Sequence, residues 1–235
     1  MYNYVLIPGA WLGGWVWNKV DRILLENGHN TFPITLTGMG ERVHLASPDK
    51  GMNTAIEDVI NVIRFNDLEN IVLVGHSFAG KVAAAVTDKI PEKIKQVVYL
   101  DSFMPDDTRE AQGTFNPMQE FGQLDKGSFT IPFSETILEN IGKDVIGKNK
   151  IWMLDKCTPW PVKLATDPIK LTRSPRLMRT AYIFCTMSSD PIDETVQGES
   201  GELFGPYRKM ETGHYPMVTK PDELARYLLE LPDIS

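Results

Sequence analysis

Short apolar runs alternate with amphipathic, helix-like stretches along most of the chain. The runs are rich in Val, Ile, Leu and Tyr and are closed by Pro, Gly or polar residues, a pattern typical of strands buried on both faces. Strands are therefore expected at 4–7, 31–36, 71–74, 97–100, 181–185 and 207–210. Helical spacing of apolar residues predicts helices at 15–27, from the Thr54–Glu57 capping-box pair onward, at 78–90 and at 221–231.

Strands separated by helices indicate a mostly parallel sheet, here of about six strands, with helices on both faces. The alternation stops between 102 and 180, where Pro, Gly, Trp and short helical patches follow one another without clear strands. Because a loop of that length is rare in a compact domain, we interpret residues 102–180 as a mainly helical cap inserted over the carboxyl edge of the sheet. Residues 1–101 and 181–235 then form the α/β core.

Composition narrows the class of protein without identifying it. The 235 residues are 42% hydrophobic and carry a net charge of -7, which is ordinary for a globular domain and provides no basic surface for nucleic acid. No apolar run reaches the ~18 residues of a membrane span, and the first residues lack the positive region of a signal peptide, so we expect a cytoplasmic protein without membrane contact. Cys157 and Cys185 match no metal-ligand spacing, and no metal or other cofactor is expected.

The segment from Val72 to Gly80 leads from a strand through a serine directly into an Ala- and Val-rich helix. This context is that of a nucleophile elbow, in which a sharp turn lifts Ser77 above the sheet at the positive end of the next helix. The turn needs small neighbours, and Gly75 and Ala79 are small, although the strict pattern has glycine where Ala79 stands. The alternative is a Gly-rich turn with a helix-capping serine, and the flanking strand and helix favour the nucleophile.

A serine nucleophile needs a base, and the chain has four histidines. His29 lies beside a helix end, His44 lies in a loop before a helix, and His76 is the direct neighbour of Ser77, so it would point away from the serine at a sharp turn. His214 lies in a loop between the last expected strand and the last helix, where the chain order Ser, Asp/Glu, His places the base. An idle, solvated loop histidine is the alternative, and the nucleophile elbow favours a catalytic one.

The acid that orients His214 should follow a strand that lies between the serine and the histidine in the sequence. Asp190 follows the expected strand 181–185 after a short loop, and its carboxylate could accept the second ring N–H of His214. A turn aspartate before Pro191 is the alternative. Asp193 and Asp101, which ends the preceding strand, remain open as competing acids.

An ester intermediate also needs two N–H donors for its oxyanion. The N–H of Phe78 at the helix start is one candidate, and the N–H of Ala10, in the Gly-rich loop after the first strand, is the other. A plain strand-to-helix turn is the alternative for that loop. Aromatic and apolar residues in the segments expected near the cleft predict an apolar pocket, although each could instead belong to the core: Trp11, Trp152, Trp160 and Met217.

These segments together resemble the α/β-hydrolases, and within them the cofactor-free esterase and hydroxynitrile lyase group, which includes plant methyl-salicylate-type esterases and bacterial carboxylesterases of the pyrethroid-hydrolase type. The resemblance covers nearly the whole chain through 4–17, 36–42, 56–59, 72–80, 98–101, 157–159 and 213–224. It implies Ser77 as nucleophile, His214 as base and Asp190 as acid. It also implies Ala10 and Phe78 as oxyanion donors beneath a mainly helical cap. Pro8 and Ala79 depart from the group's usual His and Gly.

The residues at two positions favour an esterase over a lyase within this group. The lyases that resemble these esterases carry a lysine directly after the catalytic histidine and a threonine in the oxyanion loop, whereas this chain has Tyr215 and Gly9 there. We therefore expect a serine carboxylesterase that cleaves small to medium esters with apolar acyl or aryl groups through an acyl-enzyme. A lyase and a catalytically idle small-ligand receptor are the alternatives. A homodimer is compatible with the sequence.

Overall fold

The core of the molecule is a six-stranded parallel sheet in the order β2-β1-β3-β4-β7-β8. The computed structural model describes residues 1–102, 127–188 and 205–234. The strands of this sheet are β1 (Asn3–Ile7), β2 (Asn30–Pro33), β3 (Ile71–His76), β4 (Ile94–Leu100), β7 (Thr180–Cys185) and β8 (Tyr207–Met210). Each expected strand is present, although β2 ends at Pro33, since proline lacks the N–H that a ladder needs.

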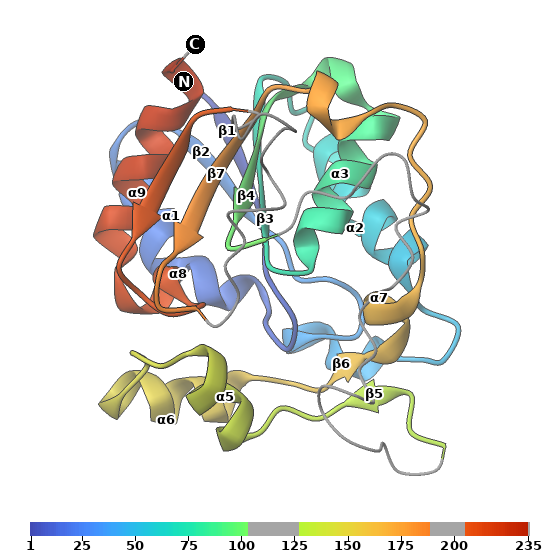
Figure 1. Cartoon of the computed structure of the whole chain (residues 1–235). Helices are drawn as coiled ribbons and strands as arrows, with labels where there is room; N and C mark the ends of the chain where they lie inside the picture. Colours follow the sequence, from blue (N-terminus) through green and yellow to red (C-terminus); the bar gives the residue numbers. More distant parts are fainter. Residues whose placement is uncertain (103–126, 189–204, 235) are drawn as a thin grey trace, which may run out of the picture.

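Helices cover both faces of the sheet (Figure 1). Helices α1 (Asn18–Glu26) and α9 (Pro221–Glu230) pack on one face, and α2 (Met52–Phe65) and α3 (Ala79–Lys89) pack on the other. Successive β1 residues point to opposite faces, so Leu6 joins the core under α1 and α9, while Val5 joins the core under α2 and α3. The continuous apolar runs of the sequence follow directly from this burial on both sides.

Helix α2 begins two residues before the Thr54 start that the capping box predicts. Its first residue, Met52, donates its N–H to the Asp167 carboxylate at 3.1 Å, and the preceding Gly51 makes no side-chain cap. A carboxylate at a helix N-terminus also interacts favourably with the helix dipole. The true cap is therefore a residue distant in the sequence, which no local pattern could have indicated.

Between β4 and β7 the described chain forms a separate group of small elements below the carboxyl ends of the strands (Figure 1). They are β5 (Thr130–Ile131), α5 (Glu135–Ile141), α6 (Gly147–Lys156), β6 (Trp160–Pro161) and α7 (Val162–Thr166). β5 and β6 pair antiparallel, and Thr158 links the group to the core by donating its N–H to the Trp11 carbonyl at 3.0 Å. A cap comprising residues 102–180 remains our proposal for this region.

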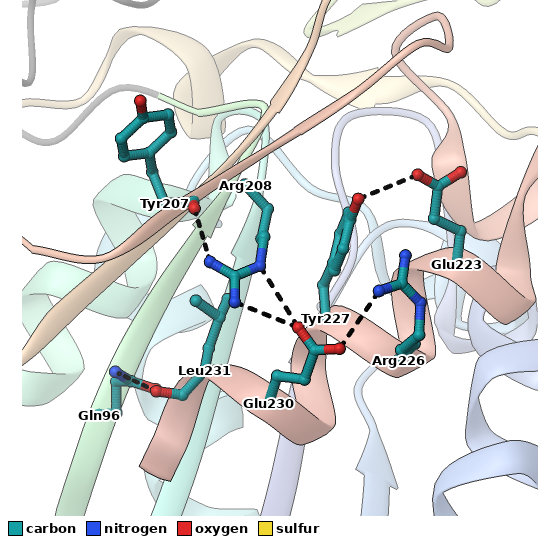
Figure 2. A network of polar contacts seen from close by, with 8 residues as sticks. All are labelled: Gln96, Tyr207, Arg208, Glu223, Arg226, Tyr227, Glu230 and Leu231. Carbon is teal, nitrogen blue, oxygen red and sulfur yellow. Dashed lines mark hydrogen bonds and ion pairs between the residues drawn. The ribbon is translucent and has the colours of Figure 1, made fainter. Parts of the chain in front are cut away.

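The edge strand β8 is tied to α9 by a polar network (Figure 2). Arg208 on β8 contacts the Glu230 carboxylate at 3.1 Å, and Arg226 contacts the same carboxylate at 3.2 Å. The two guanidinium groups flank the Tyr227 ring at 5.7 and 4.5 Å. Each exposed pair contributes little alone, but together they tie β8 to the second half of α9, the two elements on either side of one connecting loop. That loop contains α8 (Pro216–Thr219) and His214.

Short 3-10 helices connect several of the main elements. They are η1 (Gly14–Trp17), η2 (Gly40–Leu45), η3 (Pro91–Lys93), η4 (Pro175–Leu177) and η6 (Leu231–Asp233). The helix expected at 15–27 is thus divided into η1 and α1. Within the described ranges, every helix is too short or too polar to cross a bilayer.

Candidate active site

The sheet order brings the ends of three central strands together. β1 lies between β2 and β3 in the sheet. The loop after β1 leads to β2 on one side, and the loop after β3 leads to β4 on the other side, so the two loops diverge at the carboxyl ends of β1 and β3. Parallel α/β sheets bind ligands at such a point, beyond the carboxyl ends of the strands. The Gly-rich loop follows β1, Ser77 follows β3 and Asp101 follows β4, the next strand over.

Ser77 adopts the backbone conformation of a nucleophile elbow. Its φ is 57°, in the left-handed region that a side chain other than glycine rarely occupies, and such strain persists only where the surroundings impose it. A Cβ on Gly75 would lie 2.8 Å from the Ala79 carbonyl, so the strand and helix cross too closely for any side chain there. The Ser77 N–H donates to the Leu100 carbonyl at 3.0 Å, and the Ser102 hydroxyl donates to the Ser77 carbonyl at 2.5 Å.

His214 is paired with a carboxylate from the end of β4. Its Nδ1 lies 2.5 Å from Oδ2 of Asp101, whose side chain is 1% exposed. The other oxygen of Asp101 accepts the Cys185 N–H at 3.1 Å. Burial alone would raise the pKa of Asp101, but the hydrogen bond and charge of His214, with the Cys185 N–H, outweigh it and hold that pKa below its usual range. An ionised Asp101 keeps the proton of His214 on Nδ1 and leaves Nε2 to act as the base.

The predicted acid, Asp190, and its competitor Asp193 lie outside the described residues. In the described part of the molecule, the ring nitrogen that Asp190 was expected to contact is already bonded to Asp101. This contact makes Asp101, which the sequence left open as an alternative, the described candidate for the acid. The physical reason is that β4 directly adjoins β3, so its end lies beside the serine turn.

The two predicted oxyanion donors lie in segments close to Ser77. A Cβ on Gly9, in the loop after β1, would lie 3.1 Å from the Ser77 Cβ, so this loop passes close to the serine. Ala10 is the next residue along it. Phe78 precedes the first residue of α3, at the positive end of the helix. The roles of Ala10 and Phe78 as oxyanion donors remain proposals.

The predicted pocket residues separate into two groups. Trp11 and Trp160 lie with their ring centroids 5.3 Å apart, and Phe78 lies 5.1 Å from Trp160, so these three rings form one cluster beside the nucleophile. Trp152 instead packs edge-on against Trp15 at 4.8 Å, and Met217 is fully buried in the core on the α1 and α9 side. Trp11 and Trp160 are also buried, at 4% and 3% exposed, so Phe78 is the partly exposed ring of the first group and the better candidate for substrate contact.

The end of α5 and the turn after it contact the loop that carries His214. The His214 N–H donates to the Ile141 carbonyl at 2.9 Å, and the Thr212 hydroxyl donates to the Asp144 carboxylate at 2.5 Å. A Cβ on Gly213 would lie 2.7 Å from that carboxylate, so the two segments are in close contact. Ile141 and Asp144 are site residues that sequence reasoning missed, because they lie in a region without clear periodicity.

His76 is a fully buried histidine between the serine and the base loop. Its Nδ1 accepts the Gly9 N–H at 3.1 Å, and its Nε2 lies 2.8 Å from the His214 carbonyl oxygen. Burial, and then the neighbouring His214, lower the pKa of His76 to about 3. The ring is therefore neutral near pH 7, and it packs under the turn rather than acting as a base.

This buried ring predicts acid sensitivity of the fold. Because folding lowers the pKa of His76 from 6.5 to about 3, the unfolded chain binds a proton that the folded protein does not bind between these values. This stabilisation is complete above pH ~6.5 and is lost as pH falls towards ~3, an effect of at most about 5 kcal/mol. Urea unfolding of wild type and His76→Asn between about pH 7 and pH 4 measures it. The stability gap between the two proteins should narrow as pH falls, and a constant gap would contradict the prediction.

The fold and this site together define a class of protein. The model of the alpha/beta hydrolase family matches residues 4–227, and the chain belongs to that family. In the described ranges, His, Cys, Asp and Glu side chains form no group of three or more that could hold a metal ion.

The chain is also similar to individual known proteins and to a solved structure. The chain is 28% identical to the carbendazim hydrolyzing esterase of Nocardioides sp. (strain SG-4G), covering 98% of this chain and 100% of the relative. It is 30% identical to an alpha-hydroxynitrile lyase of Arabidopsis thaliana, over 46% of this chain and 42% of the relative. The solved structure of an extracellular α/β-hydrolase from a Paenibacillus species matches 100% of both chains, with a TM-score of 0.85 at 20% identity, a likeness of fold. The expected fold and group resemblance are confirmed, and the full-length esterase relative supports ester hydrolysis.

Proposed function

We propose that the protein is a serine carboxylesterase with Ser77 as nucleophile, His214 as base and Asp101, in place of Asp190, as the orienting acid. The observation that carries the proposal is the 2.5 Å contact between Asp101 and Nδ1 of His214, on the strand next to a serine held at φ 57°. Such a set activates a hydroxyl for acyl transfer without a cofactor. A ligand receptor without catalytic activity would need neither the buried Asp101–His214 pair nor the strained backbone of Ser77.

The reaction proceeds in two acyl-transfer steps. His214 Nε2 takes the proton of the Ser77 hydroxyl as its oxygen attacks the ester carbonyl, and the resulting oxyanion is stabilised by the N–H groups of Ala10 and Phe78. The intermediate collapses when the imidazolium gives its proton to the leaving alkoxide, which releases the alcohol and leaves an acyl-Ser77. Water, deprotonated by His214, then attacks the acyl group, and the acid is released with Ser77 restored.

The aromatic cluster of Trp11, Phe78 and Trp160 supports esters with an apolar acyl or aryl part. Apolar contact area binds such groups without directional polar bonds, and Phe78 is partly exposed beside the nucleophile. We propose a small-molecule ester of small to medium size as substrate. Cytoplasmic location and a homodimer remain predictions from the sequence.

Gly9 distinguishes ester hydrolysis from the lyase alternative. A Cβ at this position would lie 2.6 Å from Nδ1 of His76, so the threonine of the lyases fits only if His76 moves. We expect Gly9→Thr to lower kcat for ester hydrolysis by ~10²-fold, because the displaced loop misplaces an oxyanion donor. Gly9→Ala, which adds only the Cβ, should lose less. Turnover of a p-nitrophenyl ester and of a cyanohydrin measures both activities, and cleavage of the cyanohydrin by the wild-type protein would favour the lyase.

The direct test of the proposed function is covalent labelling. A fluorophosphonate should react with Ser77 alone, because the reagent needs a serine activated by a base next to oxyanion donors. Mass spectrometry of the digested protein identifies the labelled peptide, and Ser77→Ala should abolish the label. Ser134→Ala, which removes an exposed hydroxyl at the start of α5, is the matched control and should label as wild type does. Label that persists in Ser77→Ala would refute the assignment.

A further inference from the structure

His76 is a buried polar side chain that the proposed reaction does not use, and both of its ring nitrogens are bonded to backbone atoms of the site. Its side chain is 0% exposed. Nδ1 contacts the N–H of Gly9 in the loop after β1, and Nε2 contacts the carbonyl of His214 in the loop after β8. One ring thus joins loops from opposite parts of the chain, since His76 lies 67 residues from Gly9 and 138 residues from His214 in the sequence.

These two bonds fix the protonation state of the ring. Because the Gly9 N–H is a donor, Nδ1 must be the unprotonated nitrogen, and because the His214 carbonyl is an acceptor, Nε2 must carry the hydrogen. A second proton on Nδ1 would face the Gly9 N–H, donor against donor. The titratable groups near the ring are His214, 4.6 Å away between ring centroids, Asp101 and Tyr215. Burial keeps His76 neutral, so it neither competes for the serine proton nor repels a protonated His214.

The bond to Gly9 orients the peptide groups of the oxyanion loop. His76 accepts the N–H of Gly9, and the Gly9 carbonyl accepts the Leu12 N–H at 3.4 Å. In a trans peptide the N–H points opposite to the carbonyl. The N–H of Ala10, which shares a peptide group with that carbonyl, is therefore directed away from Leu12, and both peptide planes around Gly9 are set.

The bond from His76 to the His214 carbonyl helps to hold the main chain of the proposed base. The His214 N–H is bonded to the Ile141 carbonyl, and the His214 carbonyl is bonded to His76, so both main-chain polar groups of the base are held. The Asp101 carboxylate then fixes the ring. A displacement of about 1 Å in such a constellation can cost ~10²-fold in rate.

We propose that His76 is a positioning residue that couples the oxyanion loop to the base loop and holds both in register with the nucleophile. This inference rests on the proposed function, since it assigns a role in the chemistry of Ser77. It differs from a packing role because each ring nitrogen serves a separate part of the site, so the two contributions can be removed one at a time.

Three substitutions separate the two bonds. His76→Asn places an amide oxygen near the Nδ1 position and can keep the bond from Gly9, whereas His76→Gln places an amide N–H near the Nε2 position and can keep the bond to His214. His76→Leu keeps neither bond. We expect His76→Leu to lower kcat and the rate of fluorophosphonate reaction at Ser77 by ~10²-fold, with KM for a p-nitrophenyl ester changed by less than ~3-fold. His76→Asn should recover ~10-fold of that loss, because the oxyanion donors act mainly in the transition state.

Controls distinguish positioning from stability. Trp17→Phe alters the ring that packs edge-on against His76 at 6.4 Å without touching either hydrogen bond, and it should lower Tm while kcat stays near wild type. ¹⁵N spectra of labelled histidines should show the neutral Nε2–H form of His76 in the wild-type protein. Should His76→Leu not fold, the Asn and Gln variants and these spectra carry the test. The proposal would be overturned if the loss of kcat in the His76 variants simply followed their loss of Tm. Wild-type reaction rates in His76→Leu would overturn it as well. Failure of wild-type Ser77 to react would instead refute the proposed function.

Discussion

Replacing Asp101 with asparagine is expected to lower kcat by ~10⁴-fold while the protein still folds. The asparagine oxygen can still accept the Cys185 N–H, but its NH₂ group then faces Nδ1 of His214. Nδ1 must turn from donor into acceptor, which moves the proton of the ring to Nε2. A protonated Nε2 cannot take the proton of Ser77, so the geometry survives while the base is lost. Steady-state kinetics, with thermal melts to confirm folding, measure the effect.

Asp190→Asn and Asp193→Asn are the matched controls, since both aspartates follow the next strand of the sheet in the sequence. Each change replaces one carboxylate by an amide of nearly the same shape. If Asp101 is the acid, kcat in these two variants should stay near that of wild type. A collapse of kcat in Asp190→Asn, with near-normal turnover in Asp101→Asn, would restore the assignment that the sequence first indicates.

Replacing Ser77 with alanine is expected to lower kcat by ~10⁴-fold or more, and His214→Ala should cost about as much. The double variant should lose little beyond either single variant, because a nucleophile without its base and a base without its nucleophile are equally inactive. The residual rate should come from the oxyanion donors and substrate binding. Kinetics of the three proteins under identical conditions test this non-additivity. Losses that multiply would show that the two residues act independently and would exclude a shared proton transfer.

Ser77 and His214 could be proposed from the sequence because their signals are local or ordered along the chain. The serine stands between a buried strand and an Ala-rich helix. The strand is recognised by its continuous apolar run, and the helix by its apolar stripe. His214 follows the last strand, where chain order places the base. The strands β1, β3, β4 and β7 were predictable because burial on both faces leaves continuous apolar runs, whereas the edge strands β2 and β8 are partly exposed and gave weaker patterns.

The acid was harder to predict because it depends on which strand ends lie side by side. Asp101 and Asp190 both follow strands that precede the base loop, and the sequence does not reveal which carboxylate reaches His214. The contacts from Ile141 and Asp144, and the Asp167 cap on α2, depend on tertiary packing in the same way. Side-chain direction also separated Trp152 from Trp11 and Trp160, although all three lie in segments expected near the cleft.

The contact between the 141–144 segment and the His214 loop limits how the enzyme could be re-engineered. Caps are attractive units for exchange between relatives, because they cover the cleft and differ more than the sheet does. Here a transplant of the proposed cap would also have to supply a carbonyl for the His214 N–H and a carboxylate for Thr212. A chimera without these two acceptors would lose two of the contacts that hold the His214 loop. An exchange of residues 102–180 should therefore retain Ile141 and Asp144, or acceptors in the same places.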